Sequence, residues 1–445
     1  MNCDSARTEI IAYLKNELEA GKRKRLEEHF AKCPECRKEL EQARRLLTWT
    51  EAASDEAVVG KVEEVINNAI AAGASDIHFE SQRDDTLLVR QRVDGVLHEV
   101  ARADSPQRTG ILARMKMLAD LNVADTSLPQ DGRFRWTFRE KAFDLRVNCI
   151  PYVYGEGIVI RILDTSSVLV GMDKLGFYPE HEQALDNLLH QPNGQIIVSG
   201  PTGSGKTTTL YSLLQKLVSP DRKLMSVEDP VEYILPGVNQ IHINVRTGLT
   251  FPVVLRSFLR HDPDIIMVGE TRDLQTAEIA TQAAITGHLV LSQLHTNDAP
   301  SVITRLTDMG VEPYLIAATL LGAVSQRLAR KVCGNCGEEI EADLDSPAVK
   351  FLGITDWDLK EHKLRRGKGC EACRFTGHKG RVGLYEILTI DPEIRALIAN
   401  GVTGTELTEA ARARGFLDMR ADAKRKVLDG IIPADEAFRV LQAQL

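Results

Sequence analysis

A glycine-rich segment in the middle of the chain has the residue types that bind phosphate groups. It matches the pattern G-x-x-x-x-G-K-[ST] and runs Gly200, Pro201, Thr202, Gly203, Ser204, Gly205, Lys206 and Thr207, with Thr208 next. An apolar run at 196–199 precedes it and a helical pattern follows, which is the setting this motif requires. Backbone N–H groups of such a loop surround phosphate oxygens, the lysine contacts the β- and γ-phosphates, and the threonine hydroxyl binds Mg²⁺. The segment therefore predicts a nucleotide site with Mg²⁺.

Acidic residues border two predicted strands in the same region. They are Glu228 and Asp229 after a strand at 224–227, and Asp264 and Glu270 on either side of a strand at 265–268. Phosphoryl transfer needs carboxylates that hold Mg²⁺ and orient the attacking water. Each cluster alone is more often a solvated loop, but the shared position at strand ends favours a functional role.

Two histidines, His288 and His295, flank a strand predicted at 289–291. A single histidine beside a strand is usually a satisfied core residue. Two of them, followed by polar residues at 296–298, could instead sense the γ-phosphate. Their chemistry alone leaves both interpretations open.

Three C-x-x-C pairs among eight cysteines indicate reduced, metal-binding thiols rather than disulfides. Four of these cysteines, Cys333, Cys336, Cys370 and Cys373, can complete a closed tetrahedral Zn²⁺ site. The alternative for this set is free thiols.

A second four-ligand set lies near the N-terminus and consists of Cys3, His29, Cys33 and Cys36. His29 and Cys33 share one face of a helix, and Pro34 helps to turn the chain so that Cys36 converges with them. The alternatives are a redox-sensing thiol cluster or a decayed remnant. Cys149 has no partner in the sequence, and we expect a buried core thiol.

The elements that must position these groups fall into three predicted regions. Residues 1–48 form a helical module, 58–166 a smaller α+β domain, and 172–445 an α/β domain that includes a cysteine element at 331–381. In the smaller domain, Asp94-Gly95 and Asp131-Gly132 are predicted turns. In the α/β domain, a parallel sheet should present its carboxyl edge to the ligand.

Composition sets the remaining limits. The 445 residues include 55 Lys+Arg and 63 Asp+Glu, for a formal net charge of −8, which argues against a non-specific nucleic-acid coat. The N-terminus does not read as a secretory signal, and the longest strongly apolar stretch, 314–324, is shorter than the ~20 residues of a membrane-spanning helix. We therefore expect a cytoplasmic protein whose membrane attachment comes through a partner.

Several long motifs in fixed order resemble one family. Residues 200–208, 227–233 (VEDPVEY), 255–273 (LRSFLRHDPDIIMVGETRD) and 286–299 (TGHLVLSQLHTNDA) are similar to the Walker A, Asp box, Walker B and His box of the type II secretion and type IV pilus assembly ATPases. Upstream, 74–80 (ASDIHFE), 89–95, 128–133 (LPQDGR) and 144–163 resemble the smaller domain of this family. The resemblance covers about residues 58 to 445.

The resemblance implies a RecA-like P-loop ATPase domain, a PAS-like smaller domain before it, and a homo-hexamer that hydrolyses ATP at subunit boundaries against an inner-membrane platform protein. Lys206 and Thr207 match the phosphate and Mg²⁺ ligands, Glu228 the catalytic glutamate of the Asp box, and Glu270 the Walker B glutamate. The matching arginines are Arg146 and Arg161 in the smaller domain and Arg256 and Arg260 before Walker B. Such arginines stabilise transition-state charge and make the site depend on domain position.

The resemblance also bears on the cysteines. Secretion and pilus-extension members carry a tetracysteine element where this chain has Cys333–Cys373, whereas retraction motors typically lack it. Residues 1–48 are similar to the anti-sigma-factor type of zinc finger, which we interpret as a docking element with an unknown partner.

Two other functions compete with the motor. One is a zinc-dependent regulatory adaptor in which the ATPase is a passive nucleotide switch. The other is a DNA-transfer ATPase of related fold, which the acidic charge and the tetracysteine element disfavour; no direct nucleic-acid binding is expected.

Overall fold

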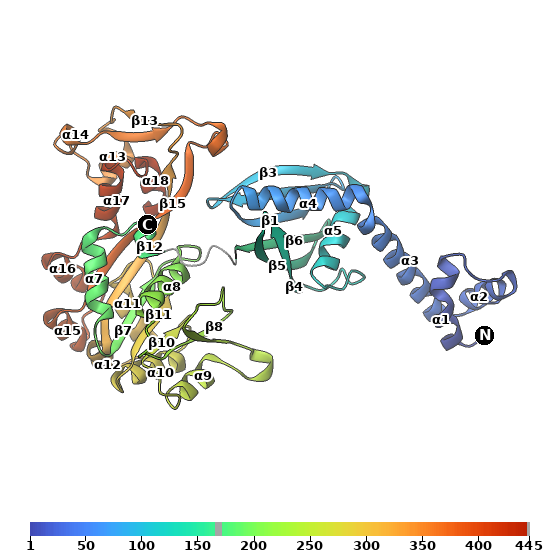
Figure 1. Ribbon diagram of the computed structural model, residues 1–445, viewed down its shortest axis with the longest axis horizontal. Helices are drawn as coiled ribbons and strands as arrows, with labels where there is room; N and C mark the ends of the chain where they lie inside the picture. The colour runs from blue at the N-terminus through green and yellow to red at the C-terminus, as the bar shows by residue number, and fades with distance from the viewer. Residues whose placement is uncertain (165–170, 443–445) are drawn as a thin grey trace. The chain divides into compact units, whose positions relative to one another are not determined.

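The structure, a computed structural model, describes residues 1–164 and 171–442 of the chain. The chain forms two compact units, residues 1–167 and 168–445 (Figure 1). The predicted end of the smaller domain at residue 166 and the last three residues of the predicted α/β domain lie outside the described residues.

The first unit begins with three helices around a small core. They are α1 (Cys3–Leu14), α2 (Ala20–Lys32) and α3 (Pro34–Ser54). Leu26 and Phe30 of α2 pack against Ile10 of α1 and Leu40 of α3 in this core. Pro34 is the first residue of α3, a position where its missing N–H removes no helical hydrogen bond.

The long helix α3 leaves this core and ends against a different one. Trp49 and Ala53, near its C-terminus, pack against Ala113 and Val123 of the smaller domain. Asp55 follows directly and accepts a hydrogen bond from the N–H of Ala57, which caps the next helix. One continuous helix therefore joins the finger to the smaller domain.

The smaller domain is an antiparallel six-stranded sheet in the order β3-β2-β1-β6-β5-β4, with two helices. Its elements are α4 (Glu56–Ala71), β1 (Ala74–Ser81), β2 (Leu87–Val93), β3 (Val96–Ala103), α5 (Ser105–Leu118), β4 (Gln130–Phe138), β5 (Lys141–Tyr152) and β6 (Gly155–Asp164). Apolar side chains of α4 and α5 pack with alternate sheet residues such as Ile77 and Phe79. Because side chains alternate along a strand, Asp76 and His78 lie on the opposite face.

One predicted turn is present and the other is wrong. Asp94 and Gly95 have positive φ angles, 47° and 84°, between β2 and β3. Asp131 and Gly132 instead lie inside β4, paired with β5. Glycine is needed there for close approach, because a Cβ on Gly132 would lie 2.3 Å from the carbonyl oxygen of Ala119.

The second unit is built on a seven-stranded sheet in the order β15-β12-β7-β11-β10-β8-β9. The strands are β7 (Gly194–Ser199), β8 (Leu224–Glu228), β9 (Val238–His242), β10 (Ile265–Val268), β11 (Leu289–Leu294), β12 (Leu320–Val332) and β15 (His378–Thr389). Every neighbouring pair is parallel except β12 with β15. The carboxyl ends of β7, β8, β10 and β11 therefore meet at one edge.

Helices cover both faces of this sheet. They include α6 (Met172–Leu175), α7 (Pro179–Leu189), α8 (Lys206–Leu217), α9 (Phe251–Phe258), α10 (Leu274–Ile285), α11 (Ser301–Asp308) and α12 (Pro313–Thr319), with a short 3-10 helix at Val245–Thr247. Ile265 and Met267 of β10 pack on the side of α7 and α8, whereas Ile266 and Val268 pack on the side of α9 and α10. Burial on both faces explains why these strands are continuous apolar runs.

A cysteine-containing insertion and the C-terminal helices complete the unit. The insertion holds β13 (Gly337–Ile340), α13 (Pro347–Leu352), α14 (Asp358–Glu361), β14 (Leu364–Gly367) and a 3-10 helix at Glu371–Cys373. The helices after β15 are α15 (Pro392–Ala399), α16 (Gly404–Ala413), α17 (Met419–Leu428) and α18 (Ala434–Gln442).

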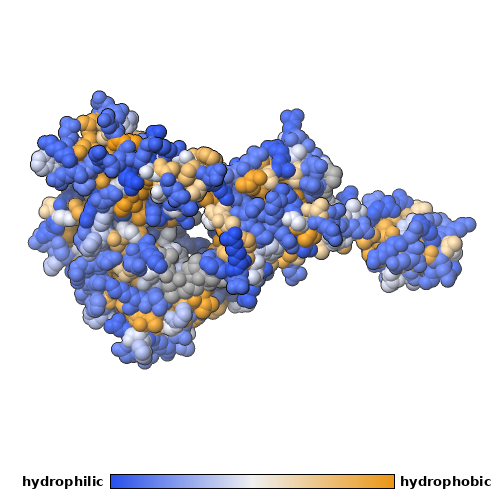
Figure 2. All heavy atoms as spheres, turned by 45° about the horizontal axis from the view of Figure 1, so that its top comes forward, coloured by the Kyte–Doolittle hydropathy of each residue, from blue (hydrophilic) through white to orange (hydrophobic). Residues whose placement is uncertain are grey.

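Hydrophilic residues cover most of the face in Figure 2, with hydrophobic residues in small groups.

Candidate nucleotide site and metal centres

The phosphate loop lies between the end of β7 and the start of α8, as its sequence requires. Gly205, the last residue before the helix, has a φ of 90°, which glycine adopts without strain. The free N–H groups at the start of α8 point toward the loop, where they and the helix dipole favour an anion.

Lys206 occupies the inside of this loop. Its Nζ donates hydrogen bonds to the carbonyl oxygens of Gly200 at 2.8 Å and Pro201 at 3.0 Å. Burial lowers the pKa of Lys206 to about 8, and the carboxylate of Glu270 acts in the opposite direction. A phosphate group would restore the favourable environment of the ammonium ion.

The phosphate loop and the end of β11 also carry buried polar atoms that have no hydrogen-bond partner among the described residues. The hydroxyl of Ser204 is buried and has no hydrogen-bond partner among the described residues. The buried oxygen Oε1 of Gln293, near the end of β11, is in the same situation. These unsatisfied groups, together with Lys206, fit a Mg²⁺-nucleotide at this position.

Glu270 and His295 meet Lys206 at the carboxyl edge of the sheet. His295 Nε2 lies 3.2 Å from Glu270 Oε1, and its Nδ1 lies 3.5 Å from Lys206 Nζ. Arg272 pairs with the other carboxylate oxygen of Glu270 at 2.7 Å. Burial would raise the pKa of Glu270, but Arg272, His295 and Lys206 together hold it below its ordinary value. Glu270 is therefore ionised beside the loop.

Glu228 lies at the same edge but is enclosed, with only 2% of the residue exposed. Its carboxylate accepts hydrogen bonds from the Tyr211 hydroxyl, from Ser226 Oγ at 2.6 Å and from Gln240 Nε2 at 3.0 Å. Burial and the adjacent Glu228 raise the pKa of Tyr211, so the hydroxyl stays protonated and donates. The sequence carries no signal for Tyr211 and Gln240, because they come from other elements; Ser226 lies two residues before Glu228 on β8 and therefore on the same face.

Two predicted site residues, Asp264 and His288, lie at the edge of the sheet opposite the phosphate loop. Asp264 precedes β10 and accepts a hydrogen bond from the N–H of Lys223 at 2.6 Å. His288 precedes β11, and its Nδ1 lies 2.8 Å from the carbonyl oxygen of Ala283. Both stand at the N-terminal ends of parallel strands, whereas the phosphate loop follows a C-terminal end.

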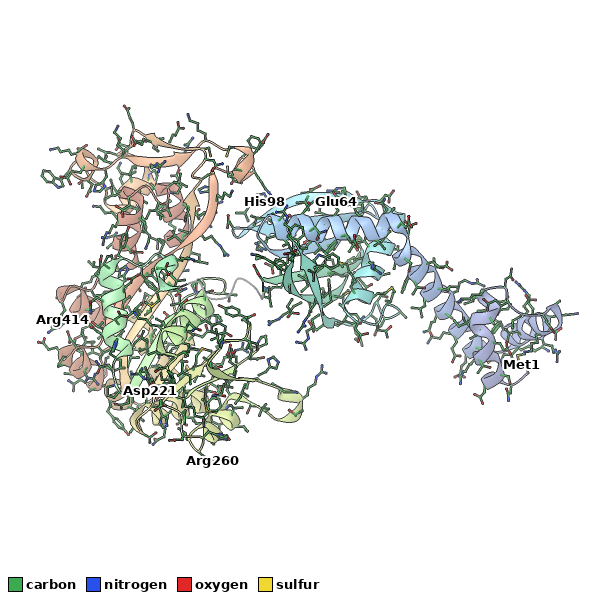
Figure 3. The ribbon with its side chains drawn as sticks, in the orientation of Figure 1. Met1, Glu64, His98, Asp221, Arg260 and Arg414 are labelled. Carbon is green, nitrogen blue, oxygen red and sulfur yellow. The ribbon has the colours of Figure 1, made fainter. Side chains whose placement is uncertain are left out.

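The two arginines before β10 lie on the surface. Arg256 is in α9 and Arg260 just after it, both exposed, and Arg260 Nη1 donates to the carbonyl oxygen of Arg256 at 3.0 Å. Figure 3 shows Arg260 at the periphery of the second unit. Among the described residues, no recorded contact joins either arginine to Lys206 or Glu270.

Arg146 and Arg161 belong to a row of arginines across the smaller sheet. Cross-strand register places Arg133 opposite Arg146, Arg146 opposite Arg161, and Arg161 opposite Asp76. Arg161 Nε donates to Asp76 Oδ1 at 3.1 Å. Arg133 is not among the predicted site residues, although the alternation of polar and apolar residues along its strand places it on the same face as Arg146 and Arg161.

The four cysteines of the insertion have the geometry of a zinc site. Sulfur–sulfur distances are 3.9 Å for Cys333–Cys370, 3.8 Å for Cys336–Cys373 and 3.7 Å for Cys370–Cys373. Tetrahedral zinc with Zn–S bonds of about 2.3 Å requires about 3.8 Å between sulfurs. The donor set therefore fits Zn²⁺.

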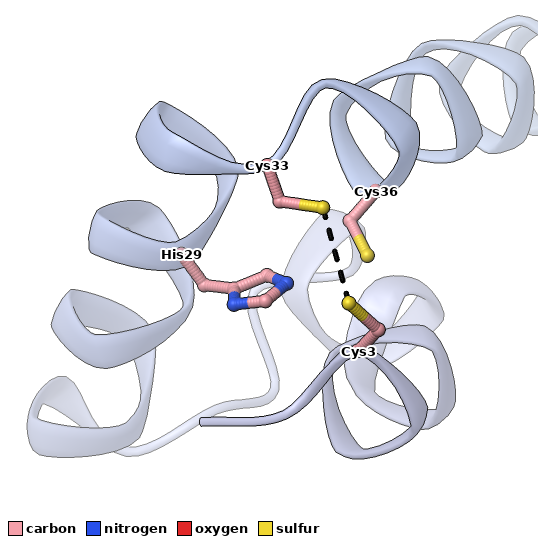
Figure 4. Close-up of side chains that lie close together, drawn as sticks. All are labelled: Cys3, His29, Cys33 and Cys36. Carbon is pink, nitrogen blue, oxygen red and sulfur yellow. Dashed lines mark hydrogen bonds between the residues drawn. The ribbon is translucent and has the colours of Figure 1, made fainter.

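The N-terminal ligands also converge, as Figure 4 shows. One ligand atom from each of Cys3, His29, Cys33 and Cys36 lies within 4.8 Å of the others. The Nε2 atom of His29 is buried and has no hydrogen-bond partner among the described residues, as expected of a metal ligand. Cys149 is buried outside both clusters, and its Sγ donates to Glu156 Oε1 at 3.2 Å.

Glu386 of β15 joins the segment after His295 to the C-terminal helices. Its carboxylate accepts from the N–H of Ala299 at 2.6 Å and from that of Met419 at 2.9 Å. Burial raises the pKa of Glu386 from 4.5 to about 7, although the hydrogen bonds from Ala299 and Met419 act to lower it. Because the folded chain holds this proton more tightly than the unfolded chain, the stabilisation is complete below pH 4.5 and is lost as the pH rises to about 7.

We therefore expect the free energy of unfolding of the wild type to fall by about 3 kcal/mol relative to Glu386→Gln across this pH range. Denaturant unfolding at a series of pH values measures the difference. The exposed residue Glu409 supplies the control, since Glu409→Gln should follow the wild type. A difference between wild type and Glu386→Gln that does not change with pH would contradict the prediction.

Among the described residues, no helix is both long enough and apolar enough to cross a membrane.

The parallel sheet, its phosphate loop and the lysine, carboxylate and histidine at its edge define the class of P-loop ATPases. A family model described as type II/IV secretion system protein matches residues 51–439, so the chain belongs to this family. A zinc-finger family model matches residues 3–37. The resemblance inferred from the motifs and the predicted α/β fold are thereby confirmed.

Named relatives agree with this assignment. The type IV pilus assembly ATPase PilB of Thermus thermophilus is 44% identical over 387 residues, which cover 86% of this chain and 43% of that protein. The type II secretion system protein HxcR of Pseudomonas aeruginosa is 44% identical over 383 residues, which cover 86% of this chain and 77% of that protein. The chain thus spans less than half of the first relative and about three quarters of the second.

The fold is also similar to a solved structure. The pilus retraction motor PilT, solved with bound ADP, aligns with a TM-score of 0.58 and 28% sequence identity over 84% of this chain and 95% of the PilT chain.

Proposed function

We propose that this chain is one subunit of a hexameric, ATP-hydrolysing motor that powers type IV pilus extension or type II protein secretion at the inner membrane. The observation that carries the proposal is the contact of Lys206 with His295, and of His295 with Glu270, beside the phosphate loop. The names of the relatives supply the pilus and secretion machines. The motor would work from the cytoplasmic side, attached through an inner-membrane platform protein.

The residues of the loop would bind the nucleotide. Lys206 and the N–H groups of the loop would hold the β- and γ-phosphates, and Thr207, Thr208 and Asp229 would hold the Mg²⁺. Bound Mg²⁺ neutralises developing charge on the phosphate oxygens. Glu270, ionised and held by His295 and Arg272, orients the attacking water. Glu228 already accepts hydrogen bonds from three buried or half-buried donors.

The arginines would make hydrolysis depend on domain position. The row that contains Arg146 and Arg161 concentrates positive charge on one face of the smaller sheet, which suits a polyphosphate. Arg256 and Arg260 are exposed, which suits contact with a nucleotide held by a neighbouring subunit. These placements explain how hydrolysis can be coupled to movement.

The finger would be a zinc-stabilised docking element for a partner at the membrane. Deleting residues 1–48 should abolish binding to the platform complex and keep Mg²⁺-dependent ATP turnover within about threefold of the full chain, because the phosphate loop lies in the other unit. Co-purification from detergent-solubilised inner membranes and a turnover assay measure the two effects.

A chain with Ile285→Ser, which changes an exposed side chain of α10 outside the finger, is the control for general surface effects. Unchanged platform binding after the deletion would contradict the docking role. Failure of the assembled wild type to turn over ATP would contradict the motor and favour the regulatory adaptor.

A further inference from the structure

The phosphate loop follows β7 and packs against the adjacent strand β12, which is longer than β7. β12 runs parallel to β7, with Ser325 opposite Ser199, the last residue of β7. β7 turns into the loop at this point, whereas β12 continues to Val332. Gln326, the next residue of β12, therefore lies directly beneath the loop.

The side chain of Gln326 contacts the loop through a buried hydrogen bond. Its Nε2 donates to the carbonyl oxygen of Ser204 at 2.7 Å, and the residue is 1% exposed. A Cβ on Gly200 would lie 2.4 Å from the carbonyl oxygen of Gln326, and one on Gly205 would lie 3.2 Å from its Nε2. The loop and this one residue are thus packed without a gap, and glycine at position 200 is what allows it.

Among the described residues, the Gln326 amide makes no side-chain hydrogen bond other than the one to Ser204. Its oxygen Oε1 is equally buried and has no hydrogen-bond partner among the described residues. Rotating the amide by half a turn would place Oε1 against the carbonyl oxygen of Ser204, so that two acceptors would meet. The observed orientation is the one that makes a hydrogen bond.

This bond determines where the next N–H points. The peptide between Ser204 and Gly205 is planar and trans, so its C=O and N–H point in opposite directions. When Gln326 holds the carbonyl of Ser204 on the outer side of the loop, the N–H of Gly205 is directed to the inner side. A phosphate-binding loop needs its N–H groups to converge on the anion.

We propose that Gln326 is a positioning residue for nucleotide binding: it fixes the Ser204–Gly205 peptide so that the N–H of Gly205 faces the phosphates. The inference rests on the proposed nucleotide site and adds a residue outside the motif, 122 positions from its partner. Without this bond the peptide can rotate, and nucleotide binding has to reorder it.

The test compares two buried glutamines of the same sheet. Gln326→Leu keeps the approximate shape and removes the donor, and it should weaken the binding of Mg²⁺-ADP and Mg²⁺-ATP about tenfold, as expected for one lost hydrogen bond. Gln195 lies at the other end of β7, is 3% exposed and donates to Thr281 Oγ1 at 2.9 Å. Gln195→Leu should affect thermal stability similarly and leave nucleotide affinity within twofold. Calorimetric titration measures the affinities.

A second variant provides a readout that a structural role would not change. In Gln326→Glu the ionised carboxylate cannot donate to Ser204, whereas the protonated acid can. The ADP affinity of this variant, relative to wild type at the same pH, should therefore recover as the pH falls. The turnover number at saturating ATP should stay within threefold of wild type in Gln326→Leu, since the effect is on binding.

Wild-type affinity in Gln326→Leu, an equal loss of affinity in Gln195→Leu, or no pH dependence in Gln326→Glu would each overturn the proposal. A wild type that binds ADP but does not turn over ATP would contradict the motor and leave this inference intact. A wild type that binds no nucleotide would contradict both the proposed motor and the proposed role of Gln326.

Discussion

Glu270→Gln is expected to lower Mg²⁺-dependent ATP turnover at least about 100-fold while ATP and ADP still bind, because the amide cannot accept a proton or orient water as the carboxylate does. The carboxylate is ionised and lies between His295 and Arg272, both within 3.2 Å. Glutamine keeps the shape of the side chain and removes only its charge. Phosphate release at saturating ATP, with nucleotide affinity measured separately, distinguishes loss of chemistry from loss of binding.

Glu278→Gln is the matched control, since Glu278 is exposed on α10 in the same unit. Its turnover should equal that of the wild type. Lys206→Ala should lose nucleotide affinity, because it acts at the binding step that precedes hydrolysis. Lys216→Ala, on the same helix, should keep wild-type nucleotide affinity. Undiminished turnover in Glu270→Gln would exclude this residue from the chemistry and leave Glu228 as the remaining carboxylate.

Removing the metal from the tetracysteine cluster is the second change with a large expected effect. Cys333→Ser with Cys370→Ser should release one of two zinc ions per chain and lower the melting temperature on the order of 10 °C. The physical reason is the position of the ligands: Cys333 directly follows β12, and Cys373 precedes β15 by a few residues. A metal bound to this cluster would therefore fix the ends of two paired strands. Metal analysis and differential scanning calorimetry measure both effects.

Cys149→Ser provides the control, since this thiol is buried outside both clusters and serine can keep the hydrogen bond to Glu156. It should retain both zinc ions. Retention of two zinc ions in the double variant, or an unchanged melting temperature, would show that the cluster does not hold a structural metal.

Much of the site could be predicted because much of its chemistry is local in sequence. The phosphate loop and each C-x-x-C pair occupy short spacings, and Glu270 and His295 follow strands whose carboxyl ends meet by the geometry of a parallel sheet. Asp264 and His288 show the limit of this reasoning. Both residues border predicted strands, but they precede β10 and β11. They therefore lie at the N-terminal edge of the sheet, whereas the phosphate loop lies at the carboxyl edge.

The missed residues depend on tertiary register. Gln326 reaches the loop because β12 extends beyond β7, and Tyr211 reaches Glu228 from a helix; neither relation has a pattern in the sequence. The failed turn at Asp131-Gly132 has a similar cause. Asp-Gly commonly forms turns, but here the glycine provides the space that the carbonyl of Ala119 occupies.

The continuous helix α3 has a consequence for how the finger can recruit a partner. A flexible tether would let the finger occupy many positions around the smaller domain. The effective concentration of a partner bound to the finger would then depend on the length of the tether. α3 instead begins at Pro34, between Cys33 and Cys36, and ends at the core that Trp49 and Ala53 form with the smaller domain. Its 21 residues span about 30 Å as a rigid spacer. A partner on the finger would therefore be held at a set distance from the smaller domain, and force could pass between them along the helix.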